Sequence, residues 1–184
     1  ITPEQKAIAQ AAFDAAEKQS FFYRAPWFEN YFQSIHDPQT SYLVLSARTD
    51  HGMATLPMKY VVAGQWPYSR AIYGAQNYYS CLFGPAVAGE HTEELYDKLL
   101  QPIHEQRLDI FDAHPLDPHH PSFAALQNAL RRQGWIIDTY LCFGNWQLDV
   151  NGRSFADYFQ TLPSTLKNTI KRKTQALMKK GNAR

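Results

Sequence analysis

The stretch that decides the fold is SYLVLSARTDHGMATLPMKYVVA, residues 41–63. Its two arms are rich in apolar and β-branched residues, and the turn sequence Asp50-His51-Gly52 separates them. Two such arms on either side of a short turn that contains glycine predict a β-hairpin. Pro57 has no backbone N–H to donate, so we expect the second strand to lie at a sheet edge or to carry a bulge.

Helices are expected on both sides of the hairpin in the sequence. The segments that are rich in helix formers, or that open with a capping residue or a proline, are 3–19, a short stretch from about Pro26, 92–106 and 121–135. We expect Pro102 to kink or end the third of these helices and Gly134 to close the fourth.

Strands alternate with these helices in the second half of the chain. A third strand is expected at residues 70–75, mostly extended chain at 77–87, and a further strand at 107–113. Residues 135–150 predict a long strand or hairpin that bends around Gly144. Together these elements predict an α+β fold, with a mixed, largely antiparallel sheet that is flanked by helices.

The last residues, SFADYFQTLPSTLKNTIKRKTQALMKKGNAR at 154–184, predict two consecutive helices. Ser154 caps the first helix, and Pro163 separates it from the second, which should run to about Lys180. We therefore expect an N-terminal α/β domain at 1–153 and a basic helical segment at 154–184. Because the chain opens without methionine and closes on this helix, we expect it to be part of a longer protein.

Charge is distributed unevenly along the chain. Residues 163–184 contain seven Lys and Arg and no acid, whereas residues 1–162 contain eleven Lys and Arg and all seventeen acids, so the net charge of +1 combines +7 and −6. One interpretation is that the basic helix packs by a narrow apolar stripe and exposes its charges. The other is an anion-binding surface, for which the residues are Lys167, Lys171, Arg172 and Lys173. Nucleic acid is disfavoured, because the charges surround the helix axis and no aromatic residues lie among them.

The two cysteines, Cys81 and Cys142, each lie in an apolar run. We expect buried thiols in a reducing, cytoplasmic compartment, with a disulfide between them as the alternative. Neither cysteine follows a glycine-rich elbow or begins a helix, so a catalytic nucleophile is disfavoured. No apolar run approaches the roughly 18 residues of a membrane span, so none is expected.

The most metal-like segment is DAHPLDPHHP at 112–121, which contains Asp112, His114, Asp117, His119 and His120. A metal site needs ligands that converge in a fixed shape. Three prolines hold this segment in extended or turn geometry, which favours a strand-to-helix connection with histidines in water. A metal site is the alternative interpretation, but we expect no metal.

No phosphate cradle is expected in this chain. Its nine glycines lie at least five residues apart, so no P-loop or G-x-G-x-x-G turn exists for a nucleotide or coenzyme A.

Polar aromatic groups follow the third strand at Asn77, Tyr78 and Tyr79. They predict either the lining of a substrate-binding cleft or a sheet rim whose polar groups bond one another.

The chain carries, in order, the segments PWFENYF, TLPMKY, YGAQNYYSCLFGP, PLDPHHPSFAALQNALRRQGW and FGNWQLDVNGRSFADYFQTLPSTLKNTIKRK. Together they resemble the CelD-like branch of the GNAT acyltransferase superfamily, over roughly residues 26–181. That branch is associated with bacterial cellulose and polysaccharide biosynthesis and is related to the FemAB-like peptidyltransferases. The last segment carries the most specific part of the resemblance.

The resemblance implies the N-terminal half of a tandem GNAT-like protein that moves an acyl group to an amine or hydroxyl on a glycan-related acceptor. The acyl-CoA site, for acetyl-CoA or a relative, would belong to the C-terminal half of the same polypeptide. No cofactor is therefore expected in this chain, and no catalytic residue can be named from the resemblance. The alternatives are a non-catalytic binding module of a polysaccharide-synthesis system and a FemAB-like transferase that uses aminoacyl-tRNA.

Overall fold

The computed structural model describes residues 3–34, 40–65, 68–106, 108–145 and 148–179. The chain forms two compact units, Ile1–Gly144 and Asn145–Arg184. The boundary expected from the sequence lay after residue 153, so the structure assigns the preceding connection to the smaller unit.

A five-stranded sheet forms the centre of the larger unit. Its strands are β1 (Thr40–Arg48), β2 (Gly52–Gln65), β3 (Tyr68–Gly74), β4 (Ala86–Gly89) and β5 (Ile110–Asp112). They follow the order β1-β2-β3-β5, and β4 pairs with the other end of β2. The pairs are antiparallel except that of β3 with β5, which is parallel. The structure thus confirms an α+β fold with a mixed, largely antiparallel sheet.

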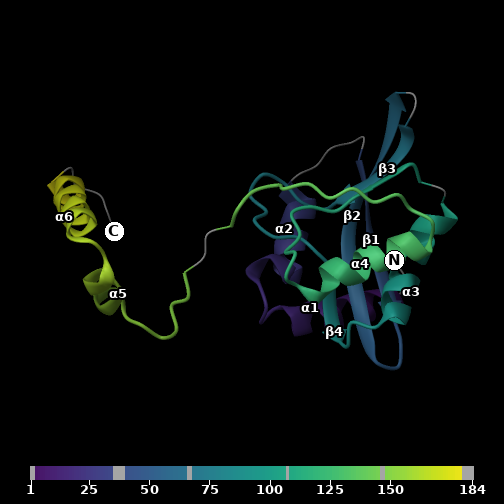
Figure 1. Cartoon of the computed structure of the whole chain (residues 1–184), viewed down its shortest axis with the longest axis horizontal. Coiled ribbons are helices and arrows are strands. Elements are labelled where there is room, and N and C mark those ends of the chain that lie inside the picture. The colour runs from purple at the N-terminus through teal and green to yellow at the C-terminus, as the bar shows by residue number, and fades with distance from the viewer. Residues whose placement is uncertain (1–2, 35–39, 66–67, 107, 146–147, 180–184) are drawn as a thin grey trace. The chain divides into compact units, whose positions relative to one another are not determined.

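Helices cover both faces of this sheet. They are α1 (Pro3–Ala16) and α2 (Ala25–Ser34), with the short 3-10 helix η1 (Phe21–Tyr23) between them, and α3 (Glu93–Glu105) and α4 (Pro121–Arg132). Figure 1 shows α1 and α2 behind the sheet and α3 and α4 in front of it. Fully buried apolar and aromatic side chains such as Leu56, Met58, Tyr96 and Leu99 form the core between these layers.

Helix boundaries follow the capping residues of the sequence. The Oγ1 of Thr92 accepts a hydrogen bond from the backbone N–H of Leu95 and so caps α3. α3 continues through Pro102 to Glu105, so this proline does not end the helix. Gly134 follows α4 with a positive φ, as expected for the residue that closes it.

Pro57 lies in the central strand β2, so the edge position expected for it is wrong. Its carbonyl accepts a hydrogen bond from the N–H of Ala75 (3.1 Å), on the side away from β1. The N and C=O of one strand residue point to the same side, so the missing N–H also faces away from β1. On that side, pairing with β4 ends at Thr55 and pairing with β3 begins at Met58, so Pro57 occupies the gap between them. The register shift of β2 lies further along the strand.

The strand or hairpin expected at residues 135–150 is absent from the described part of that segment, 135–145 and 148–150. These residues form no helix or strand, and the side chain of Ile136 is 100% exposed and that of Leu141 91% exposed. Strand propensity alone does not form a strand, because the backbone groups need a neighbouring edge to pair with.

Both cysteines are exposed, and no disulfide joins them, so the buried positions expected for them are wrong. The apolar runs that contain Cys81 and Cys142 are a surface loop and the unpaired segment after α4. The run around Cys81 still contributes to the core through Phe83, which is 1% exposed, so an apolar run does not fix which of its side chains are buried.

The smaller unit contains α5 (Phe155–Thr161) and α6 (Ser164–Lys179). The expected cap is confirmed: Ser154 and Asp157 form a reciprocal capping box at the start of α5. The expected end of the second helix, at Lys180 and Gly181, lies outside the described residues. Among the residues described in this unit none is buried, and the two leucines of α6, Leu166 and Leu177, which the sequence predicts in the narrow apolar stripe of this helix, are exposed. Over the described chain, no helix combines the length and apolar character needed to cross a bilayer.

Substituting Gly89 by alanine tests the junction of β2 with β4. Gly89 and Gly134 have similar positive φ values of 94° and 86°. A Cβ at residue 89 would overlap the backbone of His51 and lie 2.9 Å from the Cα of Gly52, whereas one at residue 134 would meet nothing within 4 Å. We expect G134A to lower the free energy of unfolding by about 1–2 kcal/mol, and G89A by about 3 kcal/mol or more. Equal losses in urea unfolding would show that β4 is not held as described.

Candidate functional site

The candidate site lies where the parallel strands β3 and β5 end. Parallel strands place their carboxyl ends at one edge of the sheet, which is where ligands bind in many α/β folds. The register sets Tyr73 opposite Asp112, so the residues that follow each strand are neighbours. Gln76 follows β3 and His114 follows β5, and these two side chains meet at this edge.

Three side chains form a continuous hydrogen-bonded group, which we call the His114 relay: Asp112, His114 and Gln76. The Nδ1 of His114 lies 2.9 Å from Oδ1 of Asp112, and the Nε2 of His114 lies 2.8 Å from the Nε2 of Gln76. The ring therefore donates its Nδ1–H to the carboxylate and accepts the amide N–H of Gln76 at Nε2. A histidine oriented in this way by a carboxylate is suited to accept a proton at Nε2.

The surrounding fold holds the His114 relay in place. Tyr140 donates its hydroxyl to Oδ1 of Asp112 (3.3 Å), and Tyr31 of α2 donates its hydroxyl to the backbone carbonyl of Gln76 (3.1 Å). Burial raises the pKa of Tyr31 to about 12, so this hydroxyl keeps its proton at neutral pH. The side chains of His114 and Asp112 are 30% and 28% exposed, so a ligand in solution can reach them.

Lys59 and Tyr73 extend the site across the sheet. Lys59 of β2 pairs in register with Tyr73 of β3, which in turn pairs with Asp112 of β5. The Nζ of Lys59 lies 5.9 Å from the centre of the Tyr73 ring, a cation–π contact. Burial lowers the pKa of Lys59, and the charge of Asp112 opposes this effect in part.

The predicted substrate-binding residues Asn77, Tyr78 and Tyr79 lie on the loop that directly follows Gln76. The Oδ1 of Asn77 accepts the backbone N–H of Tyr79 (2.9 Å) and the hydroxyl of Ser80 (3.4 Å), so this amide serves the turn. The rings of Tyr78 and Tyr79 are 97% and 75% exposed. They therefore project into solvent beside the His114 relay and do not line a cleft wall.

The predicted anion-binding residues Lys167, Lys171, Arg172 and Lys173 all lie on α6, in the smaller unit. Lys167 donates to the carbonyl of Gln160, and the Nζ of Lys171 lies 6.0 Å from the centre of the Phe159 ring. These contacts tie α6 to α5. The two predicted sets of substrate-binding residues thus belong to different units.

The histidine-rich segment divides between two places. Asp112 and His114 join the His114 relay, whereas His120 caps α4 by accepting the N–H of Ser122 at Nδ1. The backbone N–H of His119 bonds to Asp117. Within the described ranges, no group of three or more His, Cys, Asp or Glu side chains is placed to hold a metal ion.

A second polar cluster joins the starts of α3 and α4. The Nδ1 of His91 lies 2.7 Å from the hydroxyl of Tyr96, which donates to the hydroxyl of Ser122 (2.8 Å). Burial raises the pKa of Tyr96 to about 12. Because Tyr96 and Ser122 are fully or almost fully buried, this cluster fastens the two helices to each other and offers no surface to a ligand.

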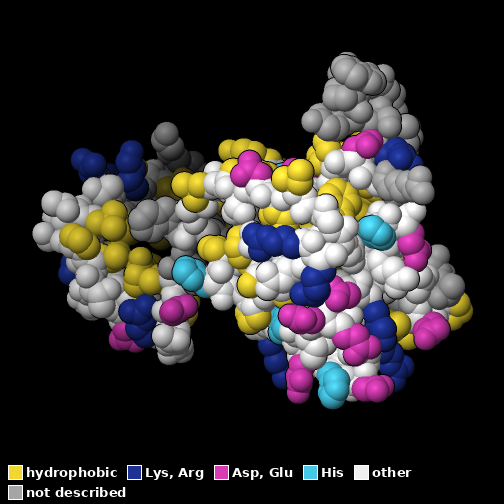
Figure 2. All heavy atoms as spheres, turned by 45° about the vertical axis from the view of Figure 1, so that its right-hand side comes forward, with side chains coloured by type: hydrophobic (Ala, Val, Ile, Leu, Met, Phe, Trp, Pro, Cys, Tyr) yellow, Lys and Arg dark blue, Asp and Glu magenta, His cyan; other side chains and the backbone are white. Residues whose placement is uncertain are grey.

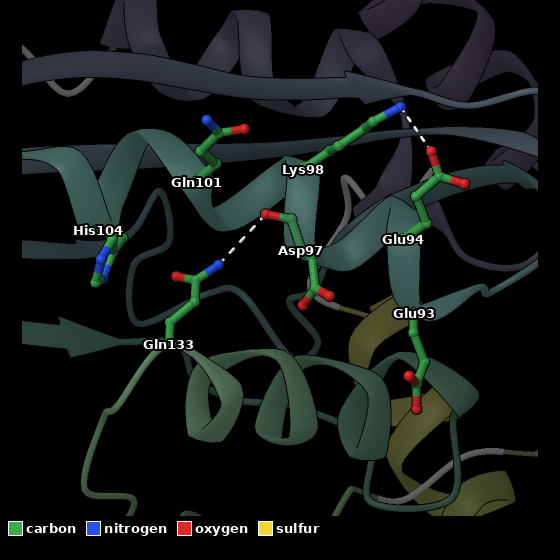
Figure 3. A pocket seen from close by; sticks show the side chains of 7 residues that line it. All are labelled: Glu93, Glu94, Asp97, Lys98, Gln101, His104 and Gln133. Carbon is green, nitrogen blue, oxygen red and sulfur yellow. Dashed lines mark hydrogen bonds and ion pairs between the residues drawn. The ribbon is translucent and has the colours of Figure 1, made fainter.

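A large open depression of about 510 Å³ lies along α3, away from the His114 relay. Figure 3 shows its lining, which is Glu93, Glu94, Asp97, Lys98, Gln101, His104 and Gln133. Its charges are already paired, since Lys98 binds Glu94 (2.7 Å) and Arg132 binds Asp97 (2.8 Å). Figure 2 shows acidic and basic side chains interspersed on the body. This depression has the character of a solvated surface, so we do not place the site there.

Sequence reasoning missed the central residues of the site. Gln76 and Lys59 lie in segments of the family resemblance but were assigned no role, and Asp112 and His114 were considered only as metal ligands. The available signal was the Asp-x-His spacing at the end of a predicted strand, which suits a carboxylate-oriented histidine as well as a metal site.

Comparisons with protein-family models, with curated proteins and with solved structures found no match for this chain.

The cluster at the starts of α3 and α4 should make folding sensitive to pH. Burial, with a smaller effect from the charge of His120, lowers the pKa of His91 below its ordinary value of 6.5. Between that lowered pKa and 6.5 the unfolded chain binds the proton more readily, so the free energy of unfolding falls as the pH falls below 6.5 and is fully recovered above it.

Urea unfolding between pH 5 and pH 8 measures this dependence. We expect H91Q to flatten the slope of the free energy of unfolding against pH, while H119A keeps the wild-type slope. An unchanged slope in H91Q would assign the pH dependence to other groups.

Proposed function

We propose that this chain forms the acceptor side of an acyltransferase, in which His114 takes the proton from an amine or hydroxyl that receives an acyl group. The single observation that carries the proposal is the His114 relay, in which Asp112 orients the ring and leaves Nε2 as the basic atom. The resemblance to CelD-like proteins of the GNAT superfamily supports the same reaction class.

The proposed chemistry is general base catalysis. The acceptor displaces the amide of Gln76 and places its N–H or O–H within hydrogen-bond distance of His114 Nε2. As the acceptor atom attacks the acyl carbonyl, its proton passes to Nε2, and the imidazolium so formed is stabilised by the carboxylate of Asp112. The thioester C–S bond breaks, so the acyl group ends as an amide or ester on the acceptor, and the coenzyme A thiolate leaves and takes up a proton to become the free thiol.

The described residues do not fit a coenzyme A pyrophosphate at this site. Such a group needs several free backbone N–H groups. At the end of β3, the N–H of Ala75 bonds to Pro57 and that of Gln76 bonds to Gly74. We therefore assign no donor-binding role to the described residues at the end of β3, and we propose that the acyl-CoA site belongs to the C-terminal half that the resemblance implies.

One observation favours a second candidate, a non-catalytic binding module. Both ring nitrogens of His114 are already hydrogen-bonded, and a structural histidine shows the same arrangement. As a binding module, the chain would use the exposed loop around Tyr78 and Tyr79 to bind a partner of a polysaccharide-synthesis system. For both candidates we propose a cytoplasmic location. The acyl-transfer assay below separates the two candidates.

The test is acyl transfer by the full-length gene product, with acetyl-CoA as donor and glucosamine, which offers both an amine and hydroxyls, as acceptor. We expect H114A to lower kcat by about 10²- to 10⁴-fold, the usual contribution of a general base, and D112N to lower it by a smaller factor. Release of free thiol measures the rate.

His119→Ala is the matched control, because the side chain of His119 is exposed on the same segment. Only the backbone N–H of His119 bonds to Oδ1 of Asp117, so that hydrogen bond does not need the imidazole ring. H119A should keep the wild-type rate. Equal rates for H114A and wild type, or no transfer by any form of the protein, would favour the binding module.

A further inference from the structure

A single polar row crosses one face of the sheet. Directly paired strand residues project from the same face. The pairs Tyr42–Lys59, Lys59–Tyr73 and Tyr73–Asp112 therefore form a row across β1, β2, β3 and β5. Tyr42 contacts the rings of Tyr31 and Phe32, which places the row on the face that α2 covers.

The neighbouring positions on this face are apolar. Two residues from the row on β2, β3 and β5, Val61 pairs with Ala71, and Ala71 pairs with Ile110. On the other side of the row, Val44 pairs with Pro57. The ammonium group of Lys59 thus lies in a largely apolar frame, where an interaction with an opposite charge is stronger than in water.

Lys59 lacks an anionic partner among the residues that the structure describes. The side chain is half-buried and its ammonium contacts the Tyr73 ring, and within the described part of the chain no carboxylate lies within 4.0 Å of its Nζ. A fully buried lysine is ordinarily paired, because removing its charge from water is costly, and half-burial of Lys59 imposes part of that cost. This lysine therefore differs from Lys98, whose Nζ lies 2.7 Å from Glu94.

Asp112 does not fill that role. Its Oδ1 already accepts hydrogen bonds from His114 and Tyr140. It also lies two strands away from Lys59 in the row, a backbone separation of about 10 Å at the usual strand spacing. The row therefore presents a base-bearing end at Asp112 and His114 and a cationic end at Lys59.

We propose that the ammonium group of Lys59 binds a carboxylate or phosphate of the ligand whose amine or hydroxyl lies at His114. The anionic group becomes the charge partner that Lys59 lacks among the described residues. The Tyr73 ring contacts the ammonium group from one side by the cation–π interaction. The assignment of the second group to His114 rests on the proposed function, whereas anion binding by Lys59 does not. The ligand class is a small amine or alcohol that also bears an anionic group several bonds away.

Site-specific labelling tests the anion site without any assay of activity. The full chain is labelled with acetic anhydride in inorganic phosphate, in sodium acetate or in chloride at constant ionic strength, and each lysine is quantified by mass spectrometry. We expect phosphate or acetate at twice its Kd to slow labelling of Lys59 about threefold relative to chloride. Lys98, exposed and already paired, is the internal control and should be labelled at one rate throughout. Which anion protects better distinguishes phosphate from carboxylate ligands.

Variants give a second measurement. The same anion should raise the Tm of the wild type and of K98M, and this rise should disappear in K59M. An equal slowing of Lys59 and Lys98, or an equal rise of Tm in K59M, would overturn the anion site. A low starting Tm of K59M does not affect the test, because the labelling is done on wild-type protein.

The two proposals fail separately in the transfer assay. K59M should raise KM for glucosamine 6-phosphate about tenfold more than it raises KM for glucosamine, because only the phosphate-bearing acceptor loses roughly one hydrogen bond to a charged group. Protection of Lys59 without any acyl transfer would keep the anion site and remove the proposed reaction. Acyl transfer without protection of Lys59 would keep the proposed reaction and remove the anion site.

Discussion

The parallel pairing of β3 with β5 is the constraint on which the site depends. It requires the chain to cross from one end of the sheet to the other, which α3 accomplishes, and it aligns the two carboxyl ends. The register of Tyr73 with Asp112 then brings Gln76 within 2.8 Å of His114, a residue 38 positions later in the chain. A shift of one residue would turn Asp112 to the other face and separate it from Lys59 and Tyr73. The polar row therefore exists only in this one register.

Local signals predicted most of the fold. The hairpin around Asp50-His51-Gly52, the cap at Thr92 and the capping box at Ser154 each depend on neighbours within a few residues, and the structure has all three. The errors concern features that depend on distant neighbours. Pro57 fits a central strand only because β3 and β4 leave a gap beside it, and the described residues of the segment, 135–145 and 148–150, pair with no strand of the sheet. Neither circumstance can be derived from strand propensity.

The candidate site was predictable only in part, for the same reason. The predicted loop with Asn77, Tyr78 and Tyr79 adjoins the His114 relay, but its substrate-binding role stays a prediction. The role of Gln76, in contrast, depends on a contact between two loops, and that of Lys59 depends on its position opposite Tyr73. A polar residue in a strand is ordinarily assigned to the solvated face. Lys59 is informative because the positions around it on its own face are apolar.

The two ends of the polar row differ in a way that bears on how a ligand would enter. His114 is already satisfied at both ring nitrogens, so a ligand must first replace the amide of Gln76, and losing one neutral hydrogen bond costs about 0.5–1.5 kcal/mol. Lys59 has no such bond to lose among the described residues, and a hydrogen bond to a charged group contributes about 1.5–3 kcal/mol. An anionic group at Lys59 would thus offset the displacement at His114. A ligand without that group would leave the Gln76 amide in place more often, so the cationic end would select which acceptors reach the base.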